Sequence, residues 1–148
     1  MKIDSNEIMQ VSVIVKNIEE TAKKIADIFG MDVPEPFKLS SLGDVYAEFK
    51  GQPTKADIKI AVFKMGPIDF ELIEPDEHPS TFKEFLDENG EGIHQFGIVV
   101  KNREEALKLL QDNGAETRYW GKYPGGTYHI MDTRDLFGTL VNVKYIED

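Results

Sequence analysis

The chain has 148 residues, a formal net charge of −10 and no cysteine, so it suits a single domain without disulfides or thiolate metal sites. The negative charge argues against nucleic acid or an anionic membrane as the main partner, because both require a cationic surface. No segment has the apolar length of a signal peptide or a membrane span, so we expect a cytoplasmic protein.

The first half of the chain begins with a predicted strand at residues 11–15, which is rich in β-branched side chains. A helix follows, because Asn17 and Glu20 have the spacing of an N-terminal cap. Gly30 stands where a left-handed residue commonly ends a helix. Three strands are then predicted at residues 44–50, 57–64 and 68–74, with a shorter piece near Phe37.

The second half of the chain repeats the first. Residues 95–105 match residues 10–20 at six of eleven positions, which is more than two similar strand-and-helix units would share by chance. The identical pairs are Gln10/Gln95, Val15/Val100, Lys16/Lys101, Asn17/Asn102, Glu19/Glu104 and Glu20/Glu105. Gly114 stands where Gly30 does in the first copy. Three strands again follow the helix, at residues 116–121, 127–132 and 139–145.

This duplication predicts an α+β fold of two tandem βαβββ modules that form one curved sheet around a shared cavity. The modules cover about residues 8–75 and 93–146, and a helix at about 80–88 joins them. Neither sheet could bury both faces alone, so we expect residues 1–148 to form one domain.

Two stretches carry a resemblance to a known family. The segments FELIEP (residues 70–75) and GEGIHQFG (residues 90–97) resemble the connection between the modules in the vicinal oxygen chelate superfamily, which includes glyoxalases, bleomycin-resistance proteins and dioxygenases. Residues 127–143 resemble the last hairpin of these proteins. The resemblance covers nearly the whole chain and is greatest to glyoxalase-like and methylmalonyl-CoA-epimerase-like members.

The resemblance implies a divalent cation (Ni, Co, Zn or Mn) held by four cavity-facing side chains. Those positions correspond here to Gln10, Glu71, Gln95 and Asn142. Epimerase-like members usually have His at the two Gln positions and a carboxylate in place of Asn142. One carboxylate and three neutral amides make a poor transition-metal site, so the metal is in doubt. A β-bulge could turn His94 inward as a substitute ligand; otherwise His94 packs at the strand entrance.

Glu71 is the candidate catalytic residue, because a buried carboxylate with a raised pKa can act as a general base. Its alternative is a structural role, hydrogen-bonded by the three amides. The candidate substrate-binding side chains are Gln10, Gln95, Asn142, Tyr128 and Glu48. For Tyr128 a plain core position is equally open, and for Glu48 a solvent-facing one.

Two functions remain open from the sequence. The first is a lactoylglutathione-lyase-like or methylmalonyl-CoA-epimerase-like lyase or isomerase that abstracts a proton next to a carbonyl of a small 2-oxo, hydroxyacyl or thioester compound. The second is a metal-free small-molecule binding or resistance protein of the same fold, which the amides favour. In either case the partner is a small molecule, and the resemblance implies a homodimer.

Overall fold

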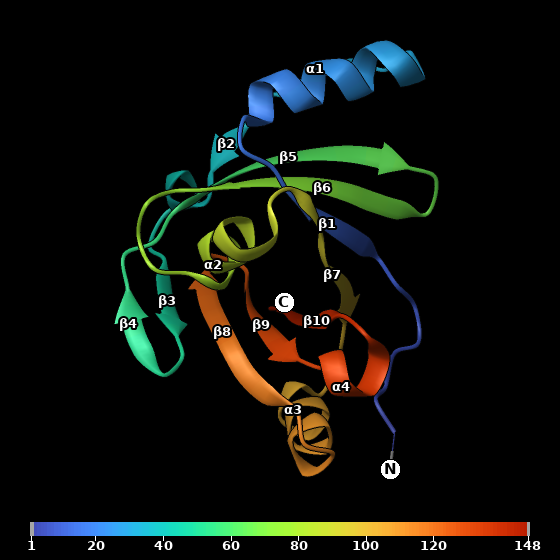
Figure 1. The fold of residues 1–148 in the computed structure, drawn as a ribbon. Helices are drawn as coiled ribbons and strands as arrows, with labels where there is room; N and C mark the ends of the chain where they lie inside the picture. Colours follow the sequence, from blue (N-terminus) through green and yellow to red (C-terminus); the bar gives the residue numbers. More distant parts are fainter. Residues whose placement is uncertain (1, 148) are drawn as a thin grey trace.

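The computed structural model describes residues 2–147, which form one mixed sheet and four α-helices. The ten strands lie in the order β2-β5-β6-β1-β7-β10-β9-β8-β3-β4, and the sheet curls around its concave face (Figure 1). The predicted α+β class is thus confirmed. The strands are β1 (Gln10–Ile14), β2 (Phe37–Lys38), β3 (Tyr46–Phe49), β4 (Gln52–Thr54), β5 (Ile58–Met65), β6 (Ile68–Pro75), β7 (Gly92–Val99), β8 (Glu116–Tyr123), β9 (Gly126–Asp132) and β10 (Leu140–Ile146).

The helices begin where their capping residues predict. The Asn17 side chain accepts a hydrogen bond from the Glu20 N–H at 3.0 Å, and Asn102 caps the second long helix in the same way. Gly30 is the C-cap of the first long helix, with φ at 66°, whereas the C-cap of the second long helix is Asn113, one residue before Gly114. No helix among residues 2–147 is both long and apolar enough to cross a membrane. The helices are α1 (Ile18–Phe29), α2 (Thr81–Asn89), α3 (Arg103–Asp112) and α4 (Arg134–Phe137).

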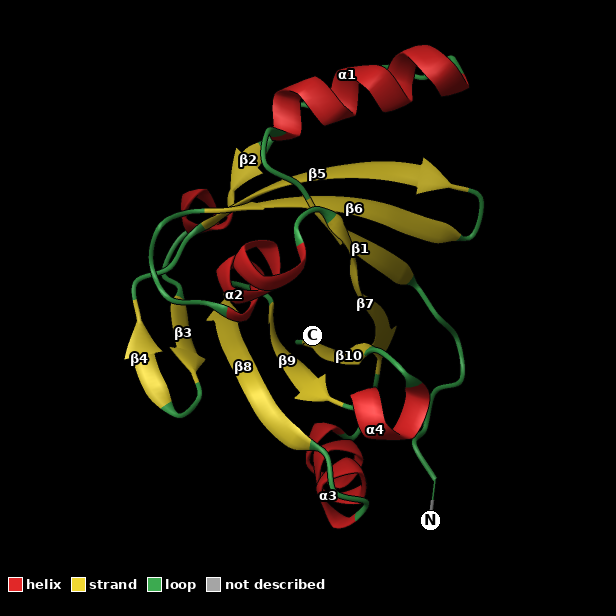
Figure 2. Ribbon diagram, in the orientation of Figure 1, coloured by secondary structure: helices red, strands yellow, loops and turns green. Residues whose placement is uncertain are grey.

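The helices cover both faces of the sheet. Figure 2 shows α1 and α3 outside the curl and α2 inside it. Apolar clusters fill each contact: Leu72 and Phe63 face α1, Val141 and Val143 face α3, and Phe82 of α2 packs on the concave side. Alternate residues of each strand therefore point to different layers, and the concave layer is where polar side chains can gather.

The strand register preserves the internal repeat. Gln10 of β1 pairs with Asp69 of β6, and Gln95 of β7 pairs with Leu140 of β10. Two residues further along, Ser12 pairs with Glu71 in the first copy, and Gly97 pairs with Asn142 in the second. Because both pairings are parallel, equivalent residues of the two copies reach equivalent places on the concave face. β1 and β7 pair antiparallel at the centre and join the copies.

One predicted strand of the first half lies beside the second half. β3, within the segment predicted at residues 44–50, pairs with β8, with Glu48 opposite Trp120. The edge of β5 is instead occupied by β2, where Phe37 pairs with Ile60. A short 3-10 helix (Leu39–Leu42) lies between β2, beside β5, and β3, beside β8. This crossing brings residues of the first half over the concave face.

Candidate functional site

Side chains from several strands converge on a concave-face cavity of about 180 Å³. The structure brings together the four residues for which the sequence resemblance predicts a cation site, namely Gln10, Glu71, Gln95 and Asn142. Tyr128 also lines this cavity. The remaining lining residues are Phe37, Leu39, Leu42, Ile58, Ile60, Val62, Ile73, Phe82, Tyr123 and Lys144. The cavity thus combines a few polar groups with a largely apolar wall, as small-molecule sites do.

A β-bulge decides which side chain of β7 enters the cavity. Ser12 pairs with Gln95 but Val13 pairs with Ile93, so His94 is the extra residue of β7. Gln95 lines the cavity, whereas His94 is buried beneath α2 between Phe82 and Phe85, with ring centroids 5.4 and 5.1 Å apart. His94 therefore packs beside the cavity rather than lining it.

His94 orients the amide of Gln95. Burial lowers the pKa of His94 to about 4, so the ring is neutral near pH 7. Gln95 Nε2 lies 3.2 Å from His94 Nδ1, and His94 Nε2 lies 3.4 Å from Thr81 Oγ1. The amide nitrogen consequently donates to the ring. Gln95 Oε1 is left buried without a hydrogen-bond partner among residues 2–147, as is Asn142 Oδ1.

A chain of hydrogen bonds crosses the cavity floor. Lys144 Nζ donates to Gln10 Oε1 at 2.9 Å, and Gln10 Nε2 donates to Ser12 Oγ at 3.2 Å. The Ser12 hydroxyl then donates to Glu71 Oε1, also at 3.2 Å. These bonds hold one carboxylate oxygen of Glu71 in place and leave Glu71 Oε2 for a ligand.

The environment of Glu71 makes it a stronger base than an exposed glutamate. Desolvation among protein atoms raises its pKa, while Lys144 and the Ser12 hydroxyl oppose that rise. Leu72, the next residue of β6, lies in the apolar cluster on the opposite face of the sheet, so strand alternation directs Glu71 to the cavity.

Tyr128 forms part of the cavity wall and stacks on Tyr119, with ring centroids 6.1 Å apart. Burial raises its pKa well above 10, so the phenol remains protonated and can donate a hydrogen bond. Its ring lies over Gly121 of β8, where a Cβ would come within 2.2 Å of Tyr128 Cζ. The Tyr128 ring therefore requires glycine at residue 121.

Replacing Gly121 with alanine is expected to lower the free energy of unfolding by about 1–3 kcal/mol, because the added methyl group overpacks the Tyr128 ring. Urea denaturation measures the loss. Gly92→Ala is a matched control, since a Cβ there meets only ordinary contacts at 3.8 Å. The double variant Gly121→Ala/Tyr128→Leu should recover part of the loss, and additive losses would contradict this account.

Glu48 is not brought to the cavity. It lies on β3 opposite Trp120 and accepts a hydrogen bond from the Tyr46 hydroxyl at 2.6 Å. Tyr46 packs against the same Trp120 ring, at 5.5 Å between centroids, on the face of the sheet away from the cavity. The structure thus separates Glu48 from the other candidate substrate-binding residues.

Three polar lining or supporting residues are absent from the sequence-based candidates: Ser12, Lys144 and Tyr123. Strand alternation could have indicated the first two, because Ser12 follows Gln10 by two residues and Lys144 follows Asn142 by two residues. Tyr123 enters the cavity from the end of β8, which only the curl of the sheet brings near.

The donor set does not fit a divalent transition metal. Three of the four corresponding side chains are neutral amides, which are weak ligands. The amide oxygen of Gln10 is already occupied by the Lys144 ammonium, which places a positive charge in the same cavity. Imidazole does not contribute either, because both ring nitrogens of His94 are engaged elsewhere.

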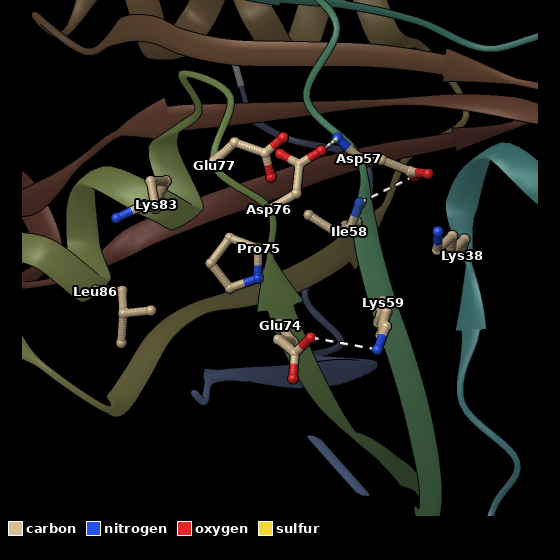
Figure 3. Close-up of a pocket in the computed structure, with 10 residues that line it drawn as sticks. All are labelled: Lys38, Asp57, Ile58, Lys59, Glu74, Pro75, Asp76, Glu77, Lys83 and Leu86. Carbon is tan, nitrogen blue, oxygen red and sulfur yellow. Dashed lines mark hydrogen bonds and ion pairs between the residues drawn. The ribbon is translucent and has the colours of Figure 1, made fainter. Parts of the chain in front are cut away.

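A more open hollow of about 550 Å³ lies at the start of β5 and the end of β6 (Figure 3). Its charged side chains are engaged within the protein: Lys59 Nζ lies 3.5 Å from Glu74 Oε2, and Asp76 Oδ2 accepts a hydrogen bond from the backbone N–H of Asp57 at 3.0 Å. Asp76, Glu77 and His78 offer ligand atoms within 4.8 Å of one another at its rim. Asp76 Oδ1 also accepts a hydrogen bond from the backbone N–H of His78, so Asp76, Glu77 and His78 form a hydrogen-bonded turn.

Comparisons with known proteins agree with this architecture. The family model described as the Glyoxalase/Bleomycin resistance protein/Dioxygenase superfamily matches residues 9–130. Among curated proteins none matches the chain significantly. Solved structures do: a hypothetical protein from Bacillus halodurans C-125 has a TM-score of 0.70 and 23% identity, covering 98% of this chain and 97% of that chain.

Two methylmalonyl-CoA epimerases are also similar in structure. The Mycobacterium tuberculosis enzyme has a TM-score of 0.65 at 18% identity, covering 95% of this chain and 88% of its own. A Streptomyces coelicolor variant in complex with 2-nitronate-propionyl-CoA has a TM-score of 0.65 at 15% identity, covering 97% and 99%. At these identities the likeness establishes a shared fold.

Proposed function

Because this chain belongs to the Glyoxalase/Bleomycin resistance protein/Dioxygenase superfamily, we propose that its cavity catalyses proton transfer at a carbon next to the carbonyl of a small molecule. Glu71 is the general base. The observation that carries the proposal is a desolvated carboxylate in the cavity, with one oxygen held by Ser12 and a pKa raised by burial.

Each feature of Glu71 serves proton abstraction. A raised pKa means that the carboxylate binds a proton more strongly, because burial among protein atoms disfavours its charged form. The bond from Ser12 restricts the carboxylate to one orientation, which reduces the cost of aligning it with a C–H bond. The apolar wall, including Ile60 and Val62, excludes water that would weaken the charges of the site.

The cavity composition favours a one-base reaction. Glu71 is the only carboxylate among the described residues that line it. A single base can remove a proton and return it to a neighbouring atom from the same side, as in isomerases and lyases. Inversion at one carbon would need a second group on the opposite side, and Glu48 lies outside the cavity.

The Streptomyces coelicolor neighbour supports an acyl substrate class, since that epimerase is bound to a CoA compound. A second function, ligand binding without chemistry, is favoured by one observation. The buried amide oxygens of Gln95 and Asn142 have no partner among residues 2–147, and a tightly bound ligand would satisfy them.

Deuterium exchange tests the proposal. The protein is incubated in D₂O with 2-hydroxyacyl, 2-oxo and thioester compounds, and ¹H NMR follows the loss of the signal from the C–H next to the carbonyl. We expect enzyme-dependent exchange for at least one class, before and after dialysis against a chelator. Binding of a compound without exchange of its proton would favour the binding protein instead.

A further inference from the structure

Lys144 is the one cationic side chain among the described residues that line the cavity. The strand register makes it the counterpart of Ile73 in the first copy of the repeat. Its strand, β10, is separated from β6 by β1 and β7, so Lys144 and Glu71 belong to opposite walls. The cavity therefore has a cation on one wall and a carboxylate on the other.

Gly97 allows Lys144 to reach Gln10. This glycine of β7 pairs with both Gln10 and Asn142, and a Cβ at residue 97 would come within 2.6 Å of Gln10 Cγ. Without that Cβ, the Gln10 side chain lies beside β7 and accepts the bond from Lys144 Nζ at 2.9 Å. The oxygen that would be a metal ligand in the family pattern thus already binds an ammonium group.

Gln95 and Asn142 contribute unused acceptors. These two residues are 1% and 5% exposed, and Gln95 Oε1 and Asn142 Oδ1 have no donor among residues 2–147. Since His94 engages the amide nitrogen of Gln95, the oxygen of that amide needs a donor from elsewhere. A ligand hydroxyl group would supply one.

We propose that the Lys144 ammonium takes the place of the divalent cation in this cavity and binds the acyl or carboxylate oxygen of a small 2-hydroxyacyl ligand. The ligand hydroxyl group, which has one proton to donate, binds the amide oxygen of Gln95 or that of Asn142. A cavity of about 180 Å³ suits a molecule of a few carbon atoms. This inference rests on the proposed function only for the orientation of the ligand, whose reacting C–H bond is directed across the cavity to Glu71.

Calorimetric titration with lactate and propionate tests the inference, because the two carboxylates differ by one hydroxyl group. Wild type is expected to bind lactate about ten-fold more tightly than propionate. Lys144→Met should weaken lactate binding by about ten- to a hundred-fold, since it removes a charge-assisted bond, whereas Lys144→Arg should retain most of it. Lys122→Met, on the exposed part of β8, is the matched control and should bind as wild type.

Equal lactate affinity in wild type and Lys144→Met, or equal affinity for lactate and propionate, would overturn the inference. If Lys144→Met does not fold, NMR of the wild-type protein tests the inference. Lactate should shift the side-chain amide signals of Gln95 and Asn142 more than propionate does; equal shifts overturn the inference.

A metal titration provides the second arm. Chelator-free wild type is expected to bind no stoichiometric Co²⁺ at the cavity, and lactate affinity should be the same with and without chelator. Stoichiometric Co²⁺ that is lost in Glu71→Gln would overturn the replacement of the cation by Lys144.

The failures of the two proposals are distinguishable, because this test measures binding. Glu71→Gln should still bind lactate. Lysine-dependent lactate binding without exchange of a C–H proton in any compound class would overturn the proposed catalysis and leave the role of Lys144 standing. If Lys144→Met exchanges the C–H proton at the wild-type rate at a ligand concentration well below saturation, the role of Lys144 is overturned and the proposed catalysis stands.

Discussion

Replacing Glu71 with glutamine is expected to slow enzyme-dependent deuterium exchange by about 10²- to 10⁴-fold, the usual contribution of a general base. Glutamine has nearly the same shape and can still accept the bond from Ser12, but its amide cannot take up a proton at neutral pH. The loss should therefore appear in kcat, while ligand affinity changes little. ¹H NMR in D₂O measures the rate on the compound that wild type exchanges fastest.

Glu48→Gln is the matched control for this result. It makes the same chemical change on the other side of the sheet, where Glu48 accepts a bond from Tyr46, so the exchange rate should stay at the wild-type level. A decrease of less than about ten-fold in Glu71→Gln, well below the contribution of a general base, would assign the proton transfer to another group.

Acid is expected to destabilise the protein through His94. Its pKa is 6.5 when exposed and about 4 in the folded protein, mainly because burial disfavours the charged ring; the Thr81 contact opposes this, and Arg118 adds to it. Between these pH values the unfolded chain binds the extra proton. The contribution of His94 to the free energy of unfolding is thus fully present above pH 6.5 and is lost as the pH falls to 4. The loss is about 3 kcal/mol, at ~1.36 kcal/mol per pKa unit.

Urea denaturation of wild type and His94→Gln at several pH values between 7 and 4 measures this contribution. The difference in unfolding free energy between the two proteins should shrink steadily as the pH falls. His129 provides the matched comparison, because its pKa is also lowered to about 4, by burial beside Trp120 and by Arg103. A difference that does not vary with pH would show that His94 has the same pKa in the folded protein as in the unfolded chain, which would contradict the prediction.

Much of the fold could be predicted from the sequence because its signals are local. The repeat of residues 10–20 at 95–105 indicated two equivalent modules, and the strand register confirms that Gln10 and Gln95 are equivalent. The caps at Asn17 and Asn102 depend on residues only three positions away. Strand alternation was enough to direct Glu71 to the concave face.

The site depended on contacts between residues far apart in the chain. Whether Gln95 or His94 faces the cavity was decided by the bulge opposite Ser12, a property of the pairing between β1 and β7. The place of Glu48 was decided by the crossing of β3 to β8, because β2 occupies the edge of β5.

The sequence by itself determined the family scaffold and the four polar positions on its concave face. Only the tertiary structure showed that this face carries a positive charge. Lys144 donates a hydrogen bond to Gln10, which lies 134 positions away in the sequence, and Gly97 leaves room for the Gln10 side chain. Periodicity shows which face a side chain occupies, but its partner there depends on how the strands align.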